Sequence, residues 1–138
     1  MNSDKKEITS ALTHLGGAIF GLLALGLLLN AAIKAGSLLA LISFLIFGLS
    51  MIFLYSTSCI YHFIDSSKKK AKLIMRKLDH IMIFVLIAGT YTPVCLLVLN
   101  KDLGYKLLAL VWSITIIGAF IKIFWINAPR WISAGLYL

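Results

Sequence analysis

Long runs of uncharged, mostly apolar residues alternate with short polar segments along the chain. Three runs without Asp, Glu, Lys or Arg cover residues 8–33, 35–64 and 81–100. A helix needs about 20 residues to cross a hydrocarbon core of roughly 30 Å, so each run is long enough to span a membrane. A fourth run, Leu107–Ile121, has 15 residues and becomes long enough only if it continues past Lys122. The pattern therefore predicts four transmembrane helices.

The boundaries of these helices follow from the charges and turn residues beside them. Lys122 is expected near one membrane face, where its stem lets the ammonium reach the headgroups. A new apolar stretch begins at Trp131 and stops at Leu138 after eight residues, and we expect it to be the start of a fifth helix. The predicted spans cover residues 8–33, 37–64, 79–99 and 105–127. A basic cytoplasmic loop covers residues 65–78, and a partly helical course of this loop along the membrane interface stays open.

The composition supports an all-α, polytopic transmembrane helix bundle. Hydrophobic residues make up 61% of the 138-residue chain, and its mean hydropathy is +0.99. Charged residues make up 13%, against about 25% in a typical soluble domain, which argues against a water-soluble fold. We expect residues 1–138 to form a single membrane domain that is incomplete.

Lys and Arg residues are concentrated in a few segments, and this predicts the orientation of the chain. The formal net charge is +8, and residues 65–78 hold six of the 13 basic residues. Basic residues accumulate in the cytoplasmic loops of membrane proteins, so the N-terminus is expected in the cytoplasm. Nucleic-acid binding is not expected, because no aromatic residues alternate with the basic run. The expected partners are membrane lipids.

Ionisable and hydroxyl side chains gather at the predicted cytoplasmic ends of the first three helices. An ionisable residue inside a membrane costs about 2.5–3.5 kcal/mol or more, so its presence indicates a functional site. Three residues of the first helix share one face through the spacing i, i+3, i+7, and two residues of the second lie one turn apart. The clustered residues are Glu7, Ser10 and His14, then Ser58 and His62, then Asp79 and His80.

Two kinds of chemistry fit this cluster. The first is a zinc site, because imidazole and carboxylate are zinc ligands. His62 is the main candidate metal ligand, Asp79 and Ser58 are the candidate catalytic residues, and Asp79, His14 and His80 are possible minor ligands. The second is a proton or ion relay built from the same groups. Alternatively, interfacial water satisfies these side chains, which is favoured for His80 because it is rotated by about 100° from Asp79.

Three further features concern packing. Gly17 and Gly21 form a G-x-x-x-G pair, which permits close helix approach in lipid. Pro93 is expected to kink the third helix. Cys59 and Cys95 are expected at opposite depths, much farther apart than the ~7 Å that a disulfide allows between Cα atoms, so they are predicted to be unbridged.

Four segments together resemble a known family. In this order, with a basic segment between the second and the third, they are similar to the bacterial hemolysin III family, which belongs with the progestin and adipoQ receptors. The resemblance covers nearly the whole chain, although Ser10 stands where the family frequently has Asn. The segments are Glu7–His14 (EITSALTH), Ser58–His62 (SCIYH), Arg76–His80 (RKLDH) and Ile87–Pro93 (IAGTYTP).

The resemblance implies a bundle of seven transmembrane helices with the N-terminus in the cytoplasm, of which this chain would hold four complete spans and the start of a fifth. It implies a zinc site near the cytoplasmic face, with His62 as the ligand from the second helix and Ser58 and Asp79 as its polar companions. Two further His ligands are implied from an H-x-x-x-H motif on the last helix, which this chain lacks. We therefore expect a C-terminally truncated member with an incomplete site.

For function, the resemblance implies a multi-pass protein of the bacterial plasma membrane that hydrolyses lipid amides such as ceramide or maintains membrane-lipid homeostasis. Two other functions stay open. One is a pore-forming or cytolytic protein, after the name of the family, and the other is a non-enzymatic sensor that reports lipid state through helix packing. An H-x-x-x-H motif further along the protein would favour metal chemistry.

Overall fold

The structure, a computed structural model, describes residues 3–127 and residue 135. The elements are α1 (Ser3–Lys34), α2 (Leu38–Phe63), α3 (Lys69–Pro93), a short π-helix η1 (Val94–Val98) and α4 (Lys101–Phe124). Within these described residues, four helices are long and apolar enough to cross a membrane, with η1 continuing the third. This confirms the predicted all-α bundle of membrane-spanning helices. The expected start of a fifth helix at Trp131 lies outside the described residues.

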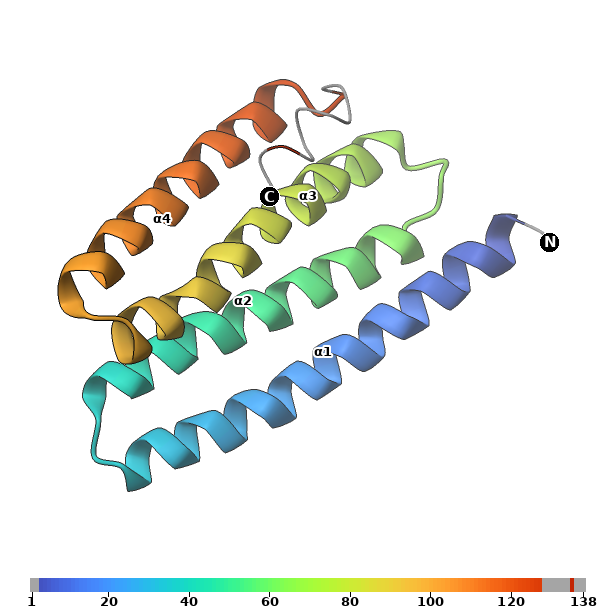
Figure 1. Ribbon diagram of the computed structural model, residues 1–138. Coiled ribbons are helices and arrows are strands. Elements are labelled where there is room, and N and C mark those ends of the chain that lie inside the picture. The colour runs from blue at the N-terminus through green and yellow to red at the C-terminus, as the bar shows by residue number, and fades with distance from the viewer. Residues whose placement is uncertain (1–2, 128–134, 136–138) are drawn as a thin grey trace.

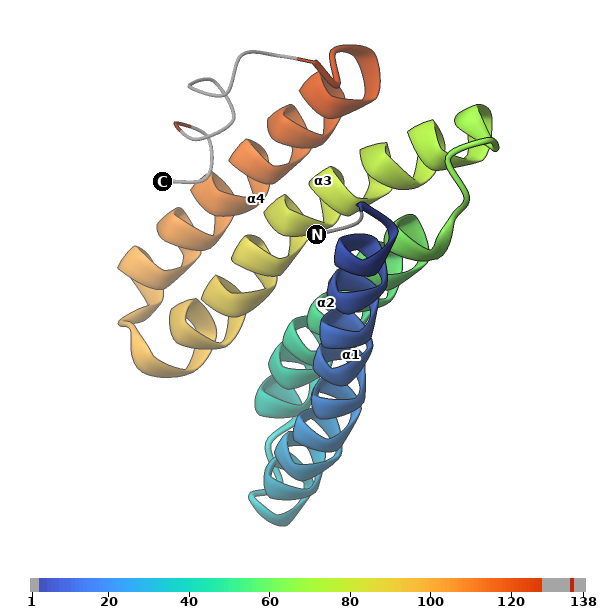
Figure 2. The same ribbon diagram turned by 90° about the vertical axis from the view of Figure 1, so that its right-hand side faces the viewer.

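The four helices lie side by side in the order of the sequence (Figure 1), and each packs mainly against the next. The α1–α2 pair is inclined to the α3–α4 pair (Figure 2). The start of α1, the α2–α3 connection and the end of α4 lie at the same end of the bundle. We call it the basic end, because the basic residues of the α1 start, of the α2–α3 connection and of the first turns of α3 lie there.

α3 begins at Lys69, well before the predicted start near residue 79, so most of the expected loop at 65–78 is helical. The physical reason is that Lys, Ala, Leu, Met and Arg all favour a helix, and charges alone do not end one. The resulting span of 30 residues is about 45 Å long, longer than the roughly 30 Å hydrocarbon core. Its charged first turns therefore extend beyond the apolar core. Likewise, α1 begins at Ser3 rather than near Ile8.

Short capped connections join the helices. Ser37 and Asn100 are the N-caps of α2 and α4, where their side chains accept backbone hydrogen bonds of 3.2 and 2.9 Å. Between α2 and α3, Asp65 Oδ1 accepts a 2.7 Å hydrogen bond from the Ser67 backbone N–H, which lowers the pKa of this carboxyl below its usual value. The Asp65 carboxylate therefore stays ionised, and keeps this turn, at a more acidic pH than a free aspartate would.

Pro93 interrupts the α-helical pattern at the predicted position. Because it has no N–H, one α-helical hydrogen bond cannot form, and the chain continues as η1. The hydroxyls of Thr90 and Thr92 each donate to the carbonyl four residues earlier, at 2.8 and 2.7 Å. Thr92 Oγ1 also accepts a 3.3 Å hydrogen bond from Trp112 Nε1 of α4. This hydroxyl-rich patch thus serves helix packing.

The α3–α4 interface is built around Phe84, whose side chain is 1% exposed. A Cβ atom at Gly118 would lie 2.5 Å from its ring, so only glycine allows this approach. Thr115 Oγ1 donates a 3.1 Å hydrogen bond to the Phe84 carbonyl.

The prediction that Lys122 extends to the headgroups is wrong, since the residue is 3% exposed. Lys122 lies seven residues after Thr115 and four residues after Gly118, and this spacing places it on the buried face of α4 with them.

Gly17 and Gly21 lie on the face of α1 that packs against α2. A Cβ atom at Gly17 would lie 2.7 Å from the Tyr55 ring, and one at Gly21 would lie 3.1 Å from Ile52 Cγ1. The adjacent Gly16, by contrast, has open space within 4 Å of such an atom. The packing role predicted for the G-x-x-x-G pair is thus confirmed. Both cysteines, Cys59 and Cys95, are buried and free, as predicted.

Replacing Gly17 with alanine is expected to lower the free energy of unfolding by about 1–3 kcal/mol, the usual cost of an extra methyl group in a filled interface. Gly16→Ala is the matched control, because its methyl group meets open space and alanine favours a helix. Titration of the protein with SDS in mixed micelles, followed by tryptophan fluorescence, measures both variants. Equal effects of the two substitutions would contradict the close contact with Tyr55.

Candidate functional site

Polar side chains from α1, α2 and α3 meet in a cavity towards the basic end of the bundle. α1 and α3 begin there and α2 ends there, so residues far apart in the sequence come to a similar depth (Figure 1). The cavity has a volume of about 300 Å³. It brings together four of the predicted site residues. The lining residues are His14, Leu54, Tyr55, Ser58, His62, Asp79 and Ile83.

His62, in the last turn of α2, is held by a carboxylate from α1. Its Nδ1 lies 2.9 Å from Glu7 Oε2, and the two side chains are 20% and 44% exposed. An ionised carboxylate only accepts hydrogen bonds, so Nδ1 carries the proton and donates. In a neutral His62 the lone pair is then on Nε2, the nitrogen available to a ligand.

Two further rings fix the plane of the His62 imidazole. His14 stacks on it, with ring centroids 5.5 Å apart and an interplanar angle of 6°, and Tyr61 meets it edge-on, with ring centroids 5.0 Å apart. Tyr55 lies one turn before Ser58 on α2, and its ring centroid is 6.0 Å from that of His14. The contact between Gly17 and the Tyr55 ring therefore supports the cavity wall as well as the α1–α2 interface.

Ser58 and Asp79 bring unused hydrogen-bonding capacity to the cavity. Ser58 is 6% exposed and the Asp79 side chain is 17% exposed. Within the described residues neither side chain has a hydrogen-bond partner, whereas the buried Ser43 and Ser50 on the same helix each donate to a backbone carbonyl at 2.7 Å. The Ser58 hydroxyl and the Asp79 carboxylate are therefore available to a ligand or to water.

His80 does not line this cavity, although it follows Asp79 directly. Its Nδ1 donates a 2.8 Å hydrogen bond to the Arg76 carbonyl and lies 3.9 Å from Asp79 Oδ2. A step of one residue along a helix turns the side chain by about 100°, which carries His80 off the face that bears Asp79. Of the possible minor ligands, the structure thus brings Asp79 and His14 to His62 and leaves His80 aside.

The sequence pattern placed Glu7 in the cluster without predicting that it bonds His62, and it did not include Tyr55 in the cluster. Both roles have a signal in spacing. Glu7 and His14 are seven residues apart on α1, and Tyr55 and His62 are seven residues apart on α2. A separation of i, i+7 keeps both members of each pair on one helix face, so each face carries two contacts to the same neighbour.

The donor groups fit part of a zinc site. Zinc takes imidazole and carboxylate ligands, and a carboxylate bound to the second ring nitrogen is the usual support of a metal-ligating histidine. His62 with Glu7 has this arrangement. Among the residues that the structure describes, no three His, Cys, Asp or Glu side chains are grouped closely enough to hold a metal ion. His62 and Asp79 could supply two ligands.

Comparison with known proteins agrees with this architecture. The chain matches the family described as "Haemolysin-III related" over residues 2–138. It is 42% identical to the "Hemolysin-3 homolog" of Bacillus subtilis (strain 168) over 134 residues, which are 97% of this chain and 62% of that protein. It is also 42% identical to the "Hemolysin-3" of Bacillus cereus over 131 residues, 95% of this chain and 58% of that protein.

The chain therefore spans about three fifths of the length of these curated relatives. No solved structure matches it. The family match extends over nearly every residue, including all four apolar helices and the three segments that form the cavity. On this evidence the chain belongs to the haemolysin-III-related family and is a membrane protein.

Proposed function

We propose that the cavity at the basic end forms one side of a zinc site in a membrane hydrolase that cleaves an amide bond of a lipid. The observation that carries the proposal is the pair Ser58 and Asp79, two poorly exposed polar groups without a hydrogen-bond partner among the described residues. Such groups are costly to enclose in a membrane protein unless they meet a ligand or water.

His62 is the proposed zinc ligand from α2. Glu7 would hold its Nδ1–H and raise the basicity of Nε2, and the stacked His14 ring would prevent the imidazole from turning away. Because no complete ligand set occurs among the described residues, further ligands are proposed to come from a later helix of the protein, as the family resemblance implies.

Bound zinc supplies a Lewis acid and an activated water nucleophile for attack on a carbonyl. Asp79, on α3, would accept the proton of the attacking water and return it to the nitrogen of the departing amine. Ser58 would orient that water through its hydroxyl, which makes no bond to its own helix. Leu54 and Ile83 provide an apolar wall that limits the access of bulk water.

Several features favour a lipid as substrate. The cavity lies between membrane-spanning helices, and Leu54 and Ile83 give it an apolar part beside its polar groups. A molecule with an amide next to a hydrocarbon chain matches that combination. We place the protein in the plasma membrane of a bacterium, because the relatives named above come from Bacillus.

The test uses the full-length protein purified in mild detergent, with zinc measured by mass spectrometry and ceramide hydrolysis measured by release of fatty acid. We expect about one zinc ion per chain, with hydrolysis that is lost on chelation and restored by added zinc. A protein that contains no zinc, or that hydrolyses ceramide equally well after chelation, would overturn the proposal.

Cytolytic activity is the second candidate function. The observation that favours it is 42% identity to a protein named Hemolysin-3. Release of a trapped dye from liposomes distinguishes the two candidates, because leakage by membrane insertion needs no zinc ligand and should persist after His62→Ala. Absence of leakage at a high ratio of protein to lipid would count against cytolysis.

A further inference from the structure

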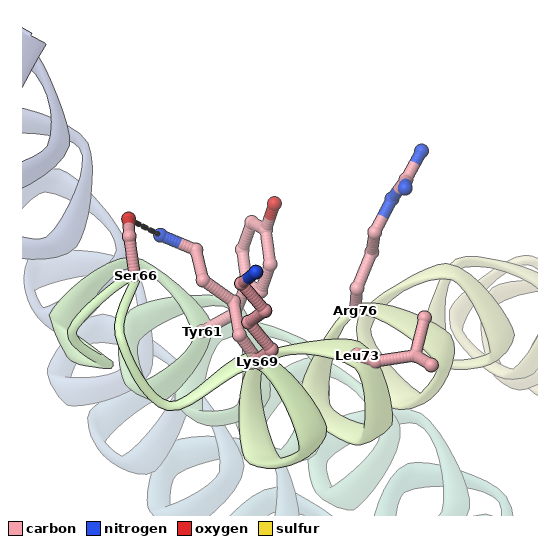
Figure 3. Close-up of a pocket in the computed structure, with 6 residues that line it drawn as sticks. Tyr61, Ser66, Lys69, Leu73 and Arg76 are labelled. Carbon is pink, nitrogen blue, oxygen red and sulfur yellow. Dashed lines mark hydrogen bonds between the residues drawn. The ribbon is translucent and has the colours of Figure 1, made fainter.

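Three cations lie on one face of α3 at the basic end, outside the His62 cavity. Lys69, Lys72 and Arg76 follow the spacing i, i+3, i+7, which aligns them along the helix. They line a second cavity of about 270 Å³ together with Tyr61 of α2, Ser66 of the connection and Leu73. Figure 3 shows the Tyr61 and Arg76 side chains projecting to the same side of α3. We call this the cationic pocket.

No carboxylate lines the cationic pocket or pairs directly with its cations among the described residues. None of its lining residues is acidic, and none of its three cations forms an ion pair with a described residue. Glu7 and Asp65 act on Lys72 through their charge, but neither forms an ion pair with it, and their hydrogen bonds go to His62 and to the Ser67 backbone. The two carboxylates offset the three cations only in part, and the pocket keeps a net positive charge.

Neutral groups hold two of the three cations in place. Lys72 Nζ donates a 3.2 Å hydrogen bond to Ser66 Oγ (Figure 3) and lies 5.6 Å from the centre of the Tyr61 ring. Arg76 Nη1 donates to Asn127 Oδ1 at 3.4 Å, which leaves most of its guanidinium donors unused. A preorganised group of cations loses less side-chain freedom when an anion binds.

The depth of the pocket matches the headgroup layer of a membrane. The span that begins at Lys69 is about 15 Å longer than a hydrocarbon core, and its charged residues all precede Ile81. Leu73, which lines the pocket and is 45% exposed, presents apolar surface beside the cations. An anionic headgroup with acyl chains attached would meet both surfaces.

We propose that the cationic pocket binds the phosphate group of an anionic phospholipid. Arg76 donates to the phosphate oxygens through its planar guanidinium, Lys69 and Lys72 add charge, and the Tyr61 hydroxyl adds a neutral donor. Leu73 contacts the start of the acyl chains. The proposal does not rest on the zinc proposal, since the two cavities share no lining residue, although the Tyr61 ring packs against His62.

The test measures binding of short-chain phosphatidylglycerol to the purified full-length protein, with short-chain phosphatidylcholine as the uncharged lipid. We expect phosphatidylglycerol to bind and phosphatidylcholine to bind far more weakly. The double variant Lys69→Gln/Arg76→Gln should lose about 30-fold in affinity, as two basic contacts near a lipid surface would supply. Tyr61→Phe, which keeps every charge, should lower the affinity by a smaller factor.

Lys68→Gln/Lys70→Gln is the matched control, because it removes two charges from the same end without touching the cationic pocket. It should leave the affinity nearly unchanged, and circular dichroism of all variants checks that the helices are retained. Equal losses in the two double variants would assign binding to the general charge of the basic end and overturn the proposal. So would competition by inorganic phosphate at the affinity of the lipid, which would identify free phosphate as the ligand.

Discussion

Replacing His62 with alanine is expected to remove bound zinc from the purified protein and to lower its hydrolysis of ceramide by about a hundredfold or more. Even the loss of an outer partner of a zinc ligand costs about 10–100-fold in metal affinity or activity, and loss of the ligand itself costs more. The imidazole is also held by Glu7 and stacked on His14, so the substitution removes the ring that these contacts position.

Two companion variants make this result specific. Glu7→Gln keeps the size of the side chain but weakens its bond to His62, and it should have an intermediate effect on zinc content and rate. His80→Ala is the matched control, because it removes an imidazole from the same end of the bundle that does not line the cavity. Turnover that survives His62→Ala, or an equal loss in His80→Ala, would eliminate the zinc hydrolase.

Replacing Asp79 with asparagine is expected to lower the turnover number by roughly 10²–10⁴-fold, the usual contribution of a positioned proton acceptor. Asparagine has nearly the same shape but cannot take a proton from water. The Asp79 side chain is 17% exposed, and it makes no hydrogen bond to another described residue, so its removal should leave the fold intact.

Measuring both the zinc content and the turnover of each variant separates a catalytic role from a structural one. Asp79→Asn should retain zinc while turnover falls, whereas loss of the metal together with the rate would make Asp79 a ligand instead. Ser58→Ala should reduce turnover less than Asp79→Asn, because the serine orients water without accepting its proton. Retention of the full rate in Asp79→Asn would exclude it as the proton acceptor.

The transmembrane helices could be predicted from the sequence because a membrane span needs only length and the absence of charge. The start of α3 could not be predicted, because the basic residues from Lys69 onward are compatible with a helix as well as with a loop. Their charge indicates where they lie relative to the membrane and does not indicate their secondary structure. Lys122 was misplaced for a related reason. Its burial depends on the face of α4 that meets α3, which apolar length does not reveal.

The candidate site was predictable at the level of depth. Ser58, His62 and Asp79 lie at the ends of consecutive helices, and antiparallel neighbours bring such ends together, as the cavity confirms. The bond between His62 and Glu7 was not predictable, because it depends on how α1 is rotated against α2. That rotation is set by contacts such as Gly17 against the Tyr55 ring, which a single sequence does not specify.

The continuity of α3 from Lys69 through Asp79 has a consequence for the substrate. Arg76 and Asp79 are three residues apart, so their levels along the helix axis differ by only about 4.5 Å. If the cationic pocket binds a phosphate, the Asp79 carboxylate lies within one helical turn of the phosphate plane of that leaflet. The proposed reaction is then confined to bonds at the boundary between headgroup and hydrocarbon, where the amide of a lipid lies. Bonds in the middle of an acyl chain are out of its reach.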